Sequence, residues 1–510
     1  MSVRVLLDGH SLSLESVEAV SRDLSLQVGL SDTARAAVAG SRAFIVSKVA
    51  TGERVYGVTT GFGRLADVVI APEERAALQH NLVRSHASGV GEALDVPAVR
   101  SIILLRANAL ARGRSGCRVE LVERLLDLLN HGVHPRVPRY GSVGASGDLA
   151  PLAHVALTLL GEGQAERGGR EAPAGVLLAE AGLGPFPLEA KEGLSLINGT
   201  QATTALGILA LLGAERALDS LEVAGAMSLE ALLGTPEAFR KEIQEARPHR
   251  GQAESAARLR HLLRDSQIRE SHRAGDPRVQ DAYSLRCMPQ VHGAAREALR
   301  YVRGILETEA NSATDNPLVF AEAEAVLSGG NFHAQVVSQA LDFLAVAVAD
   351  LAAISERRME RMLNPDLSVG LPAFLTDRPG LCSGLMITQV TAADSLAEMR
   401  VLAHPASVDS VTTSANQEDH VSMGMAAARK ARQAVACLEQ VVSAELLCAA
   451  QGIEFRRPLQ GGKGVEDAHA LIRERVAPLH GDRPLGPDLD ALVDLVRGGA
   501  LARLAREAEP

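Results

Sequence analysis

The sequence contains no tryptophan, and aromatic residues make up only 3% of its 510 positions. Aromatic side chains are among those that favour β-sheets, so a core built from extensive sheets is disfavoured. Hydrophobic residues nevertheless account for 46% of the chain, and most of them are Leu, Ala and Val. This composition is typical of helices packed against helices. We therefore expect a mainly α-helical protein, and its length suggests two or three domains.

The sequence also lacks an excess of basic residues and a set of paired cysteines. The 52 Lys and Arg residues are outnumbered by 62 Asp and Glu residues, which gives a net charge of −10. A nucleic-acid-binding surface needs a concentrated basic face, so that class of protein is disfavoured. The five cysteines are scattered, odd in number and without a CxxC pair. This pattern is typical of free thiols in a reducing compartment.

Long hydrophobic runs and cofactor signatures are missing as well. The N-terminus has no apolar signal-peptide core, and the most apolar stretch, 343–349, is far too short to cross a bilayer. The 15 histidines include no HExxH pattern, and Gly461–Gly464 lacks the spacing of a phosphate-binding loop. We expect a cytoplasmic protein without membrane or nucleic-acid contacts, without a metal and without an external cofactor.

Residue periodicity divides the chain into two predicted domains. Residues 1–198 mix short elements, including a strand at 3–7, a helix with an N-cap at Ser31 and a glycine-rich turn at 161–175. Residues 199–510 form a predicted bundle of long helices. Their apolar residues occur on most sides, which indicates burial in a bundle or a subunit interface. These helices are expected at 200–233, 285–309, 332–363, 386–403 and 423–450.

The most informative stretch, Gly141–His154, reads GSVGASGDLAPLAH. An isolated Ala-Ser-Gly would indicate only a loop before a helix that Asp148 caps. Chemically, Ala145 and Gly147 are small enough for the Gly147 nitrogen to approach the Ala145 carbonyl. Ser146 can then lose its hydroxyl group as water, and the ring that forms is a methylidene-imidazolone. The positive end of the following helix would favour electron density gathered at this electrophile.

The whole string resembles the signature of the histidine/phenylalanine/tyrosine ammonia-lyase family, and further motifs of that family occur in its order. The resemblance implies a methylidene-imidazolone formed autocatalytically from Ala145-Ser146-Gly147 and a small amino acid substrate. It also implies a homotetramer whose active sites are shared between subunits. The further motifs are Tyr56–Gly63 (YGVTTGFG), 197–201 (INGTQ), 280–286 (QDAYSLR), 329–333 (GGNFH) and 416–420 (NQEDH).

The same resemblance implies roles for individual residues. Arg286 suits the substrate carboxylate, because a guanidinium group matches a carboxylate with two hydrogen bonds. Asn198 holds the amino or the carboxylate group. Tyr56 is the catalytic base and Tyr283 a supporting proton-transfer or positioning group. A free phenol has a pKa of about 10, so nearby cations and helix dipoles would have to lower the pKa of Tyr56. Two further residues have supporting roles, Gln280 as a hydrogen-bonding group and Phe332 as a wall beside the electrophile.

Two polar positions favour L-histidine as the substrate and trans-urocanate as the product. His86, in Ser85-His86, is similar to the histidine branch of the family, whereas tyrosine-specific relatives have His-Leu there and phenylalanine-specific ones Phe-Leu. Glu418 can pair with an imidazole N–H, and an apolar ring would leave its carboxylate buried and unpaired. The chain departs from the usual histidine-branch residues at Ala282, Met288, Gln335 and Met399-Arg400.

Three alternatives were compared with this interpretation. An aromatic ammonia-lyase or a 2,3-aminomutase would use the same electrophile, and only the product separates these enzymes. A lyase of the fumarase/aspartase type would show a Ser-rich loop with Met-Pro-Lys-Asn spacing, which the sequence lacks. An inactive helical scaffold would have lost reactive residues, but Tyr56, Ser146, Tyr283 and Arg286 are all present.

Overall fold

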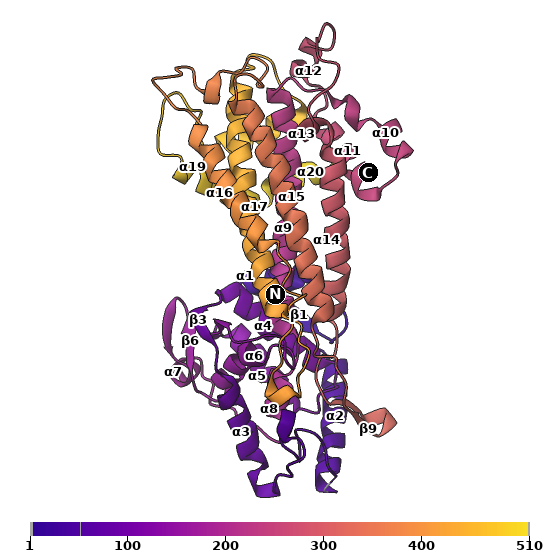
Figure 1. Ribbon diagram of the computed structural model, residues 1–510. Helices are drawn as coiled ribbons and strands as arrows, with labels where there is room; N and C mark the ends of the chain where they lie inside the picture. Colours follow the sequence, from indigo (N-terminus) through magenta and orange to yellow (C-terminus); the bar gives the residue numbers. More distant parts are fainter. Residues whose placement is uncertain (1–3, 52, 508–510) are drawn as a thin grey trace. The chain divides into compact units, whose positions relative to one another are not determined.

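The computed structural model describes residues 4–51 and 53–507 and is mainly α-helical, as predicted (Figure 1). The chain forms two compact units built from segments that alternate along the sequence. The first unit contains Met1–Leu209, Arg303–Asp342 and Pro405–Arg429, and the second contains Ala210–Val302, Phe343–His404 and Lys430–Pro510. The two predicted domains, 1–198 and 199–510, stay a prediction.

The first unit combines short strands with helices of moderate length. Its strands pair in small sheets, of which β1–β2 is parallel and the others are antiparallel. The strands are β1 (Arg4–Leu7), β2 (Gln27–Leu30), β3 (Val90–Ala93), β4 (His134–Pro135), β5 (Pro138–Tyr140), β6 (Gln164–Arg167), β7 (Arg170–Pro173), β8 (Leu318–Phe320) and β9 (Ala325–Leu327). The helices are α1 (Leu14–Arg22), α2 (Asp32–Ala50), α3 (Arg75–His86), α4 (Val96–Ala111), α5 (Val119–Asn130), α6 (Leu149–Leu159), α7 (Ala174–Glu180) and α8 (Glu192–Ile197).

Helix starts in this unit follow from local sequence chemistry. Ser31 caps α2 as predicted, because its side chain accepts a hydrogen bond from the Ala34 N–H. Asp95 caps α4 in the same way through the Ala98 N–H. Helix α4 is buried on every side from Ala98 to Ala111, including the side chains of Arg100 and Arg106. It therefore forms the centre of the first unit, against which α1 and α5 pack.

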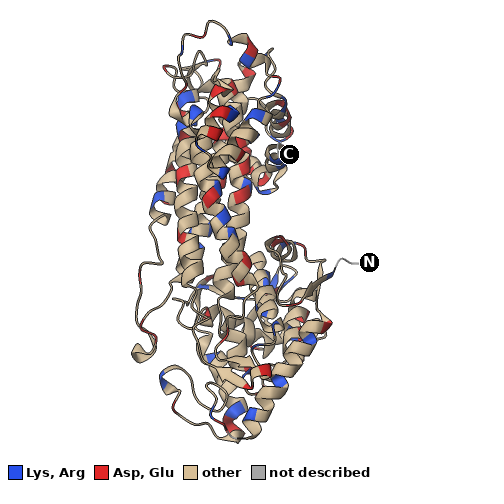
Figure 2. Cartoon of the chain, turned by 90° about the vertical axis from the view of Figure 1, so that its right-hand side faces the viewer, with Lys and Arg blue, Asp and Glu red and all other residues tan. Residues whose placement is uncertain are grey.

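Long helices dominate the second unit, and they lie side by side in both views of the chain (Figures 1 and 2). Each of the four longest also contributes residues to the first unit. Those four are α9 (Gln201–Ala231), α14 (Met288–Ala310), α15 (Gln335–Leu363) and α17 (Gly424–Glu454). The shorter helices of the second unit are α10 (Lys241–Ala246), α11 (Arg250–Leu262), α12 (Gln267–Ser271), α13 (Tyr283–Arg286), α16 (Met386–Leu402), α18 (Lys463–Arg473), α19 (Gly486–Arg497) and α20 (Ala500–Arg506).

Four of the five predicted long helices are confirmed with small shifts at their ends, and the fifth, expected at 285–309, begins at Met288 as α14. Two of them, α15 and α17, are long and apolar enough to span a membrane, but most of each apolar window is buried inside the protein, as in the core helices of soluble proteins. All five cysteines are free. Lys and Arg residues lie among Asp and Glu residues, and Figure 2 shows no face of a single sign among the described residues on the side it presents.

Charged residues inside the second unit are paired across its helices. Arg358 of α15 donates to Glu445 of α17 at 2.7 Å, and both side chains are fully buried. Ser228 of α9 donates to the same carboxylate at 2.7 Å. An unpaired buried charge would strongly destabilise the fold, so these contacts fix how α9, α15 and α17 pack.

Two local predictions differ from the structure. The glycine-rich turn expected at 161–175 contains the hairpin of β6 and β7, in which only Ala165 is buried. The helix expected at 285–309 is interrupted at Cys287, so that α13 is a separate short helix before α14. The strand expected at 3–7 is present as β1, and Val3 lies outside the described residues.

Candidate active site

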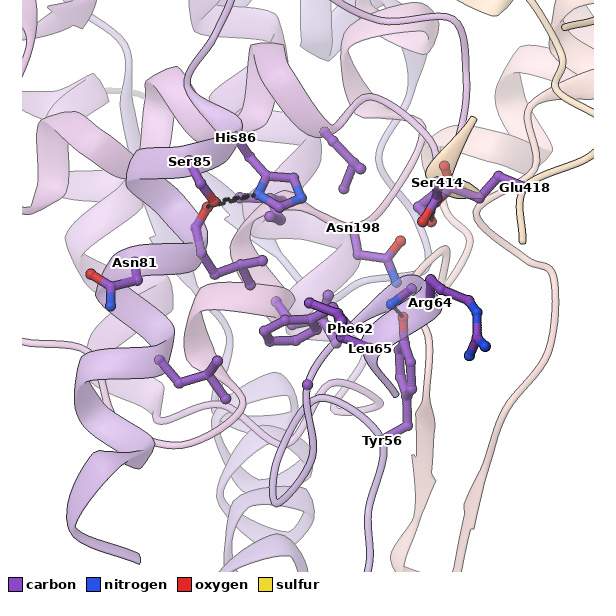
Figure 3. Close-up of a pocket in the computed structure, with 18 of the residues that line it drawn as sticks. Tyr56, Phe62, Arg64, Leu65, Asn81, Ser85, His86, Asn198, Ser414 and Glu418 are labelled. Atoms are coloured by element: carbon purple, nitrogen blue, oxygen red, sulfur yellow. Dashed lines mark hydrogen bonds between the residues drawn. The ribbon is translucent and has the colours of Figure 1, made fainter. Parts of the chain in front are cut away.

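The first unit contains a cavity of about 940 Å³, and several of the predicted site residues line it (Figure 3). Its walls come from the loop that begins at Tyr56, from one face of α3, from the end of α8 and from the turn that carries Glu418. Most of the lining is apolar. The predicted site residues in its lining are Tyr56, His86, Ser146, Asn198 and Glu418.

The loop that contains Ala145-Ser146-Gly147 is sharply bent at one edge of this cavity. Ser146 has a φ of 52° and Gly147 a φ of 79°, and both values lie in the left-handed region. The Gly147 N–H donates to the Gly144 carbonyl at 3.4 Å. A Cβ atom on Gly147 would lie only 2.3 Å from the Gly199 oxygen, so a larger residue does not fit there. The bend therefore requires the small residues that the sequence provides.

Asp148 anchors this loop from behind, although not in the expected way. Its side chain does not cap α6, the helix it precedes. Instead, its carboxylate accepts hydrogen bonds from the Thr203 N–H at 2.7 Å and the Thr203 hydroxyl at 2.8 Å. Asp148 thus caps α9. Complete burial raises the pKa of Asp148 to about 6, although the hydrogen bonds from Thr203 and Ser142 oppose this shift.

Asn198, directly after α8, presents a single free polar atom. Its amide nitrogen donates to the Asp315 carboxylate at 3.2 Å and to the Asn316 carbonyl at 2.9 Å. Both of these groups accept hydrogen bonds, so the orientation of the amide is determined. The Asn198 side-chain oxygen is buried and has no hydrogen-bond partner among the described residues. An unpaired acceptor in a cavity wall is a suitable site for an N–H donor of a ligand.

Asp315, which orients Asn198, is held in turn by a buried ion pair. Its carboxylate lies 2.8 Å from the Lys191 ammonium group, and the two side chains are 2% and 0% exposed. Because both charges are desolvated, removal of either one would leave the other unpaired. The pair therefore fixes the carboxylate to which Asn198 donates.

His86 ends α3 with its ring at the cavity wall. Nδ1 lies 2.9 Å from the Leu82 carbonyl and 3.0 Å from the Ser85 hydroxyl. The carbonyl oxygen only accepts hydrogen bonds, which assigns the proton of a neutral ring to Nδ1. Nε2 is then an acceptor. Figure 3 shows the ring of His86 beside Ser85, to which a dashed line joins it, with Asn81 further along the same helix.

Glu418 lies on the turn formed by residues 413–418, which we call the acidic turn. Its carboxylate Oε1 accepts a hydrogen bond from the Ser146 hydroxyl at 3.1 Å. The chain that follows the turn is joined to the Ser146 loop, since the Met423 N–H donates to the Val143 carbonyl at 2.9 Å. Gly144 packs closely against Ser422 at the same junction. The acidic turn and the Ser146 loop therefore form one connected wall of the cavity.

Tyr56 lies on the opposite loop, with its hydroxyl oxygen accepting a hydrogen bond from the Gly63 N–H at 3.0 Å. Its ring packs edge-on against Phe62, with 6.3 Å between the ring centroids. Burial raises the pKa of Tyr56 above its usual value, the Gly63 N–H opposes this shift, and the Glu418 carboxylate adds to it. A base active at neutral pH would need the reverse, a lowered pKa.

The remaining predicted residues do not line this cavity. Tyr283, Arg286 and Gln280 belong to the second unit, where the Arg286 guanidinium lies 4.5 Å from the centroid of the Tyr283 ring. Tyr283 is 71% exposed. Gln280 lines a separate, much smaller cavity of that unit. Phe332 is half-buried in the first unit, just before α15.

Several residues with clear structural roles at the site were not identified from the sequence. Asp315 and Lys191 orient Asn198, and Thr413 contacts Glu418 at 2.7 Å. Arg64 is a cationic residue in the cavity lining, and its side chain is 66% exposed. The polar run Thr314-Asp315-Asn316, which follows a long helix and precedes a proline, is the one local signal that could have drawn attention to Asp315.

Comparison with known proteins relates this fold and this cavity to a group of lyases. Residues 12–474 match the family model described as aromatic amino acid lyase. The chain is 52% identical over 506 residues to the histidine ammonia-lyase of Myxococcus xanthus (strain DK1622), and the match covers 99% of each protein. The chain therefore belongs to the aromatic amino acid lyase family.

Solved structures share the whole fold. A histidine ammonia-lyase from Trypanosoma cruzi has a TM-score of 0.93 and 44% sequence identity, and the match covers 100% of this chain and 96% of that one. A tyrosine aminomutase from Streptomyces globisporus has a TM-score of 0.93 and 37% identity, with 99% of each chain covered. The fold thus accommodates both kinds of named enzyme, and the contacts inside the cavity have to decide between substrates.

Proposed function

We propose that this enzyme eliminates ammonia from L-histidine to give trans-urocanate. The observation that carries the proposal is the set of hydrogen-bond acceptors in the cavity lining: the unpaired Asn198 Oδ1, His86 Nε2 and the Glu418 carboxylate, whose Oε1 loses its partner when the Ser146 hydroxyl leaves. Histidine presents N–H donors at its ammonium group and its ring, and these acceptors match them. The relatives named histidine ammonia-lyase, which are about half identical along the full length, support the same substrate.

We further propose that Ala145-Ser146-Gly147 cyclises into a methylidene-imidazolone, without an external cofactor. The residues present fit this group, because the loop is already bent at Ser146 and Gly147 and no larger side chain fits at Gly147. Ring closure joins the Gly147 nitrogen to the Ala145 carbonyl carbon and releases one water. Loss of the Ser146 hydroxyl and α-proton releases a second. When formed, the group supplies an electrophile that no ordinary side chain offers.

The chain's own residues then bind and orient the substrate. Asn198 Oδ1 accepts a hydrogen bond from the ammonium group, since this oxygen is its only free polar atom. Arg286 binds the carboxylate, because its guanidinium group can form two parallel hydrogen bonds to it. Its buried Nε atom has no partner among the described residues. Phe332 and Gln280 complete the walls of the assembled site.

The ring is recognised by His86 and Glu418. Nε2 of His86 and the carboxylate of Glu418 both accept hydrogen bonds, and a protonated imidazole ring offers two N–H groups. A phenyl ring would leave both acceptors unpaired, at a cost of about 1–3 kcal/mol for each lost partner. This difference favours histidine over phenylalanine.

Tyr56 serves as the base that removes the β-proton of the substrate, and Tyr283 supports proton transfer or positioning. The pKa of Tyr56 is raised in this chain by burial and by Glu418. A cationic group brought near its phenol in the assembled enzyme would stabilise the phenolate and lower that pKa. The substrate's ammonium group and the Arg286 guanidinium are cations of the required kind.

The active form is a homotetramer in the cytoplasm, with active sites shared between chains. Apolar side chains that remain exposed on long helices support an assembly, because isolated soluble chains seldom expose such helix faces. They include Phe343 and Val346 of α15 and Ile387 and Val390 of α16. Light scattering should give the mass of four chains, and a monomer with full activity would contradict the assembly.

A direct assay tests the proposed reaction. On addition of L-histidine, the ultraviolet absorbance of a conjugated imidazole acrylate should appear together with one equivalent of free ammonia. Product analysis with histidine, tyrosine and phenylalanine separates the alternatives. A cinnamate product or a β-amino acid would replace the proposal by an aromatic ammonia-lyase or an aminomutase.

A further inference from the structure

The acidic turn, residues 413–418, is closed by a pair of reciprocal backbone hydrogen bonds. The Thr413 N–H donates to the Glu418 carbonyl at 2.9 Å, and the Glu418 N–H donates to the Thr413 carbonyl at 3.3 Å. In an antiparallel pair of this kind, directly opposed side chains lie on the same face. The Thr413 hydroxyl consequently reaches the Glu418 carboxylate and donates to Oε2 at 2.7 Å.

The chain between these two residues adopts an unusual backbone conformation. Ser414, Ala415 and Asn416 have φ values of 49°, 51° and 66°, in the left-handed region that L-residues rarely adopt. None of the three is glycine, so this conformation persists only because neighbouring contacts hold it. Gly63 packs against this segment, since a Cβ atom there would lie 2.7 Å from the Ser414 hydroxyl oxygen. The turn is therefore held in place at both of its ends and along one side.

The two oxygens of Glu418 have different partners as a result. Oε2 is bonded to Thr413, whereas Oε1 accepts the hydrogen bond from Ser146, another residue of the cavity lining, at 3.1 Å. A glutamate side chain has three rotatable bonds and loses considerable rotamer freedom when it is held in one orientation. The Thr413 hydroxyl is the group in this turn that limits that freedom.

We propose that Thr413 is a positioning residue for recognition of the substrate ring. It holds the Glu418 carboxylate so that Oε1 remains directed into the cavity and available to an N–H of the ring. This inference rests on the role proposed above for Glu418. It predicts that loss of the Thr413 hydroxyl weakens binding of imidazole-containing ligands and leaves binding of phenyl-containing ligands unchanged.

The test uses the full-length enzyme and two competitive inhibitors, imidazole-4-propionate and 3-phenylpropanoate, which differ only in their ring. Thr413→Val removes the hydroxyl and keeps the shape, Thr413→Ala also removes it and needs less space, and Thr413→Ser keeps it. Thr412→Val is the matched control, because Thr412 is exposed and does not line the cavity. Intact mass confirms in each variant that the two waters have been lost.

A hydrogen bond to a charged group contributes substantially to binding when it holds that group in place. Loss of the Thr413 hydroxyl in Thr413→Val and Thr413→Ala should therefore lower the affinity for imidazole-4-propionate by about tenfold. Both variants should bind 3-phenylpropanoate as the wild type does, and Thr413→Ser and Thr412→Val should match the wild type for both inhibitors. In a Glu418→Ala background, Thr413→Val should change the affinity for imidazole-4-propionate by less than twofold, since the two residues act as one unit.

The proposal would be overturned if Thr413→Val lowered the affinity for both inhibitors equally, or if it had its full effect in the Glu418→Ala background. Either result would show a general structural role for Thr413. An unchanged affinity for imidazole-4-propionate in a variant that lacks the hydroxyl would also overturn it. A wild-type enzyme that binds both inhibitors equally and does not turn over histidine would instead refute the proposed function. The two failures are thus distinguished by the wild-type measurement.

Discussion

Replacement of Asn198 by leucine is expected to weaken binding at one end of the substrate and not at the other. Asn198 uses both amide hydrogens inside the protein, toward Asp315 and Asn316, and its oxygen is the free atom in the cavity wall. An oxygen of this kind accepts a hydrogen bond, so its ligand must be the ammonium group and not the carboxylate. A hydrogen bond to a charged group contributes about 1.5–3 kcal/mol, which corresponds to about 10- to 100-fold in affinity.

Two competitive inhibitors with the same imidazole ring measure this effect. Histamine carries the ammonium group without the carboxylate, and imidazole-4-propionate carries the carboxylate without the ammonium group. Asn198→Leu should lower the affinity for histamine by about 10- to 100-fold. It should change the affinity for imidazole-4-propionate by less than about twofold. Contacts to the ring cancel in the comparison, because both inhibitors share it.

The variant also removes two buried hydrogen bonds, so thermal unfolding has to be recorded alongside. Asp315 keeps its ion pair with Lys191 in the variant, which limits the loss of stability to roughly 1–3 kcal/mol. If the variant distorted the cavity, it would weaken the binding of both inhibitors. A loss confined to imidazole-4-propionate would refute the reasoning, because Asn198 would then bind the carboxylate.

Four further predictions follow from the same geometry. Ser146→Ala should abolish both the loss of two waters in the intact mass and the activity, and an active variant would contradict the proposed electrophile. His86→Leu should lower kcat/KM for histidine by about tenfold or more, since it removes one ring acceptor, and an unchanged value would contradict that role. Arg286→Gln should lower the affinity for imidazole-4-propionate and leave the affinity for histamine unchanged. Arg64→Gln, the exposed control, should change neither affinity. Complete burial raises the pKa of Asp148 from its usual 3.8 to about 6. The folded chain therefore keeps a proton that the unfolded chain releases, and the corresponding stability, about 3 kcal/mol, is present below pH 4 and lost as the pH rises through 6. Asp148→Asn should remove this component from urea unfolding measured between pH 4 and 7, and equal pH slopes in the two proteins would disprove it.

The long helices were predictable because their apolar residues recur at helical spacing, and α9, α15, α16 and α17 lie within a few residues of the expected ranges. The hairpin of β6 and β7 was not predictable in the same way. Its strands lie largely in solvent, so they show no alternation of apolar and polar residues. The pairing instead depends on the turn at Gly168 and Gly169, both of which have positive φ values.

The residues of the candidate site were recognisable as motifs, but their contacts were not. Asp148 precedes α6 in sequence, and its capping of α9 depends on Thr203, which lies 55 positions further along the chain. Similarly, the free oxygen of Asn198 exists because Asp315, 117 positions away, occupies the amide nitrogen. Local sequence can draw attention to a residue such as Asp315, but it does not indicate the distant residue with which that residue pairs. Such pairings arise only when the tertiary fold brings the segments together.

The polarity of the cavity in the first unit suits only part of the zwitterionic substrate that we propose. Asn198, His86 and Glu418 all present acceptors, which match the ammonium group and the ring of histidine. A carboxylate placed among these acceptors would need a positively charged donor. In the described lining the Lys or Arg side chain is that of Arg64, which is largely exposed and therefore screened by water. The carboxylate thus requires a less exposed cation, and the unpaired, buried Nε of Arg286 has that character. Under the proposed roles, different groups bind the two charged ends of the zwitterion, which fixes its orientation and thereby selects one particular β-proton.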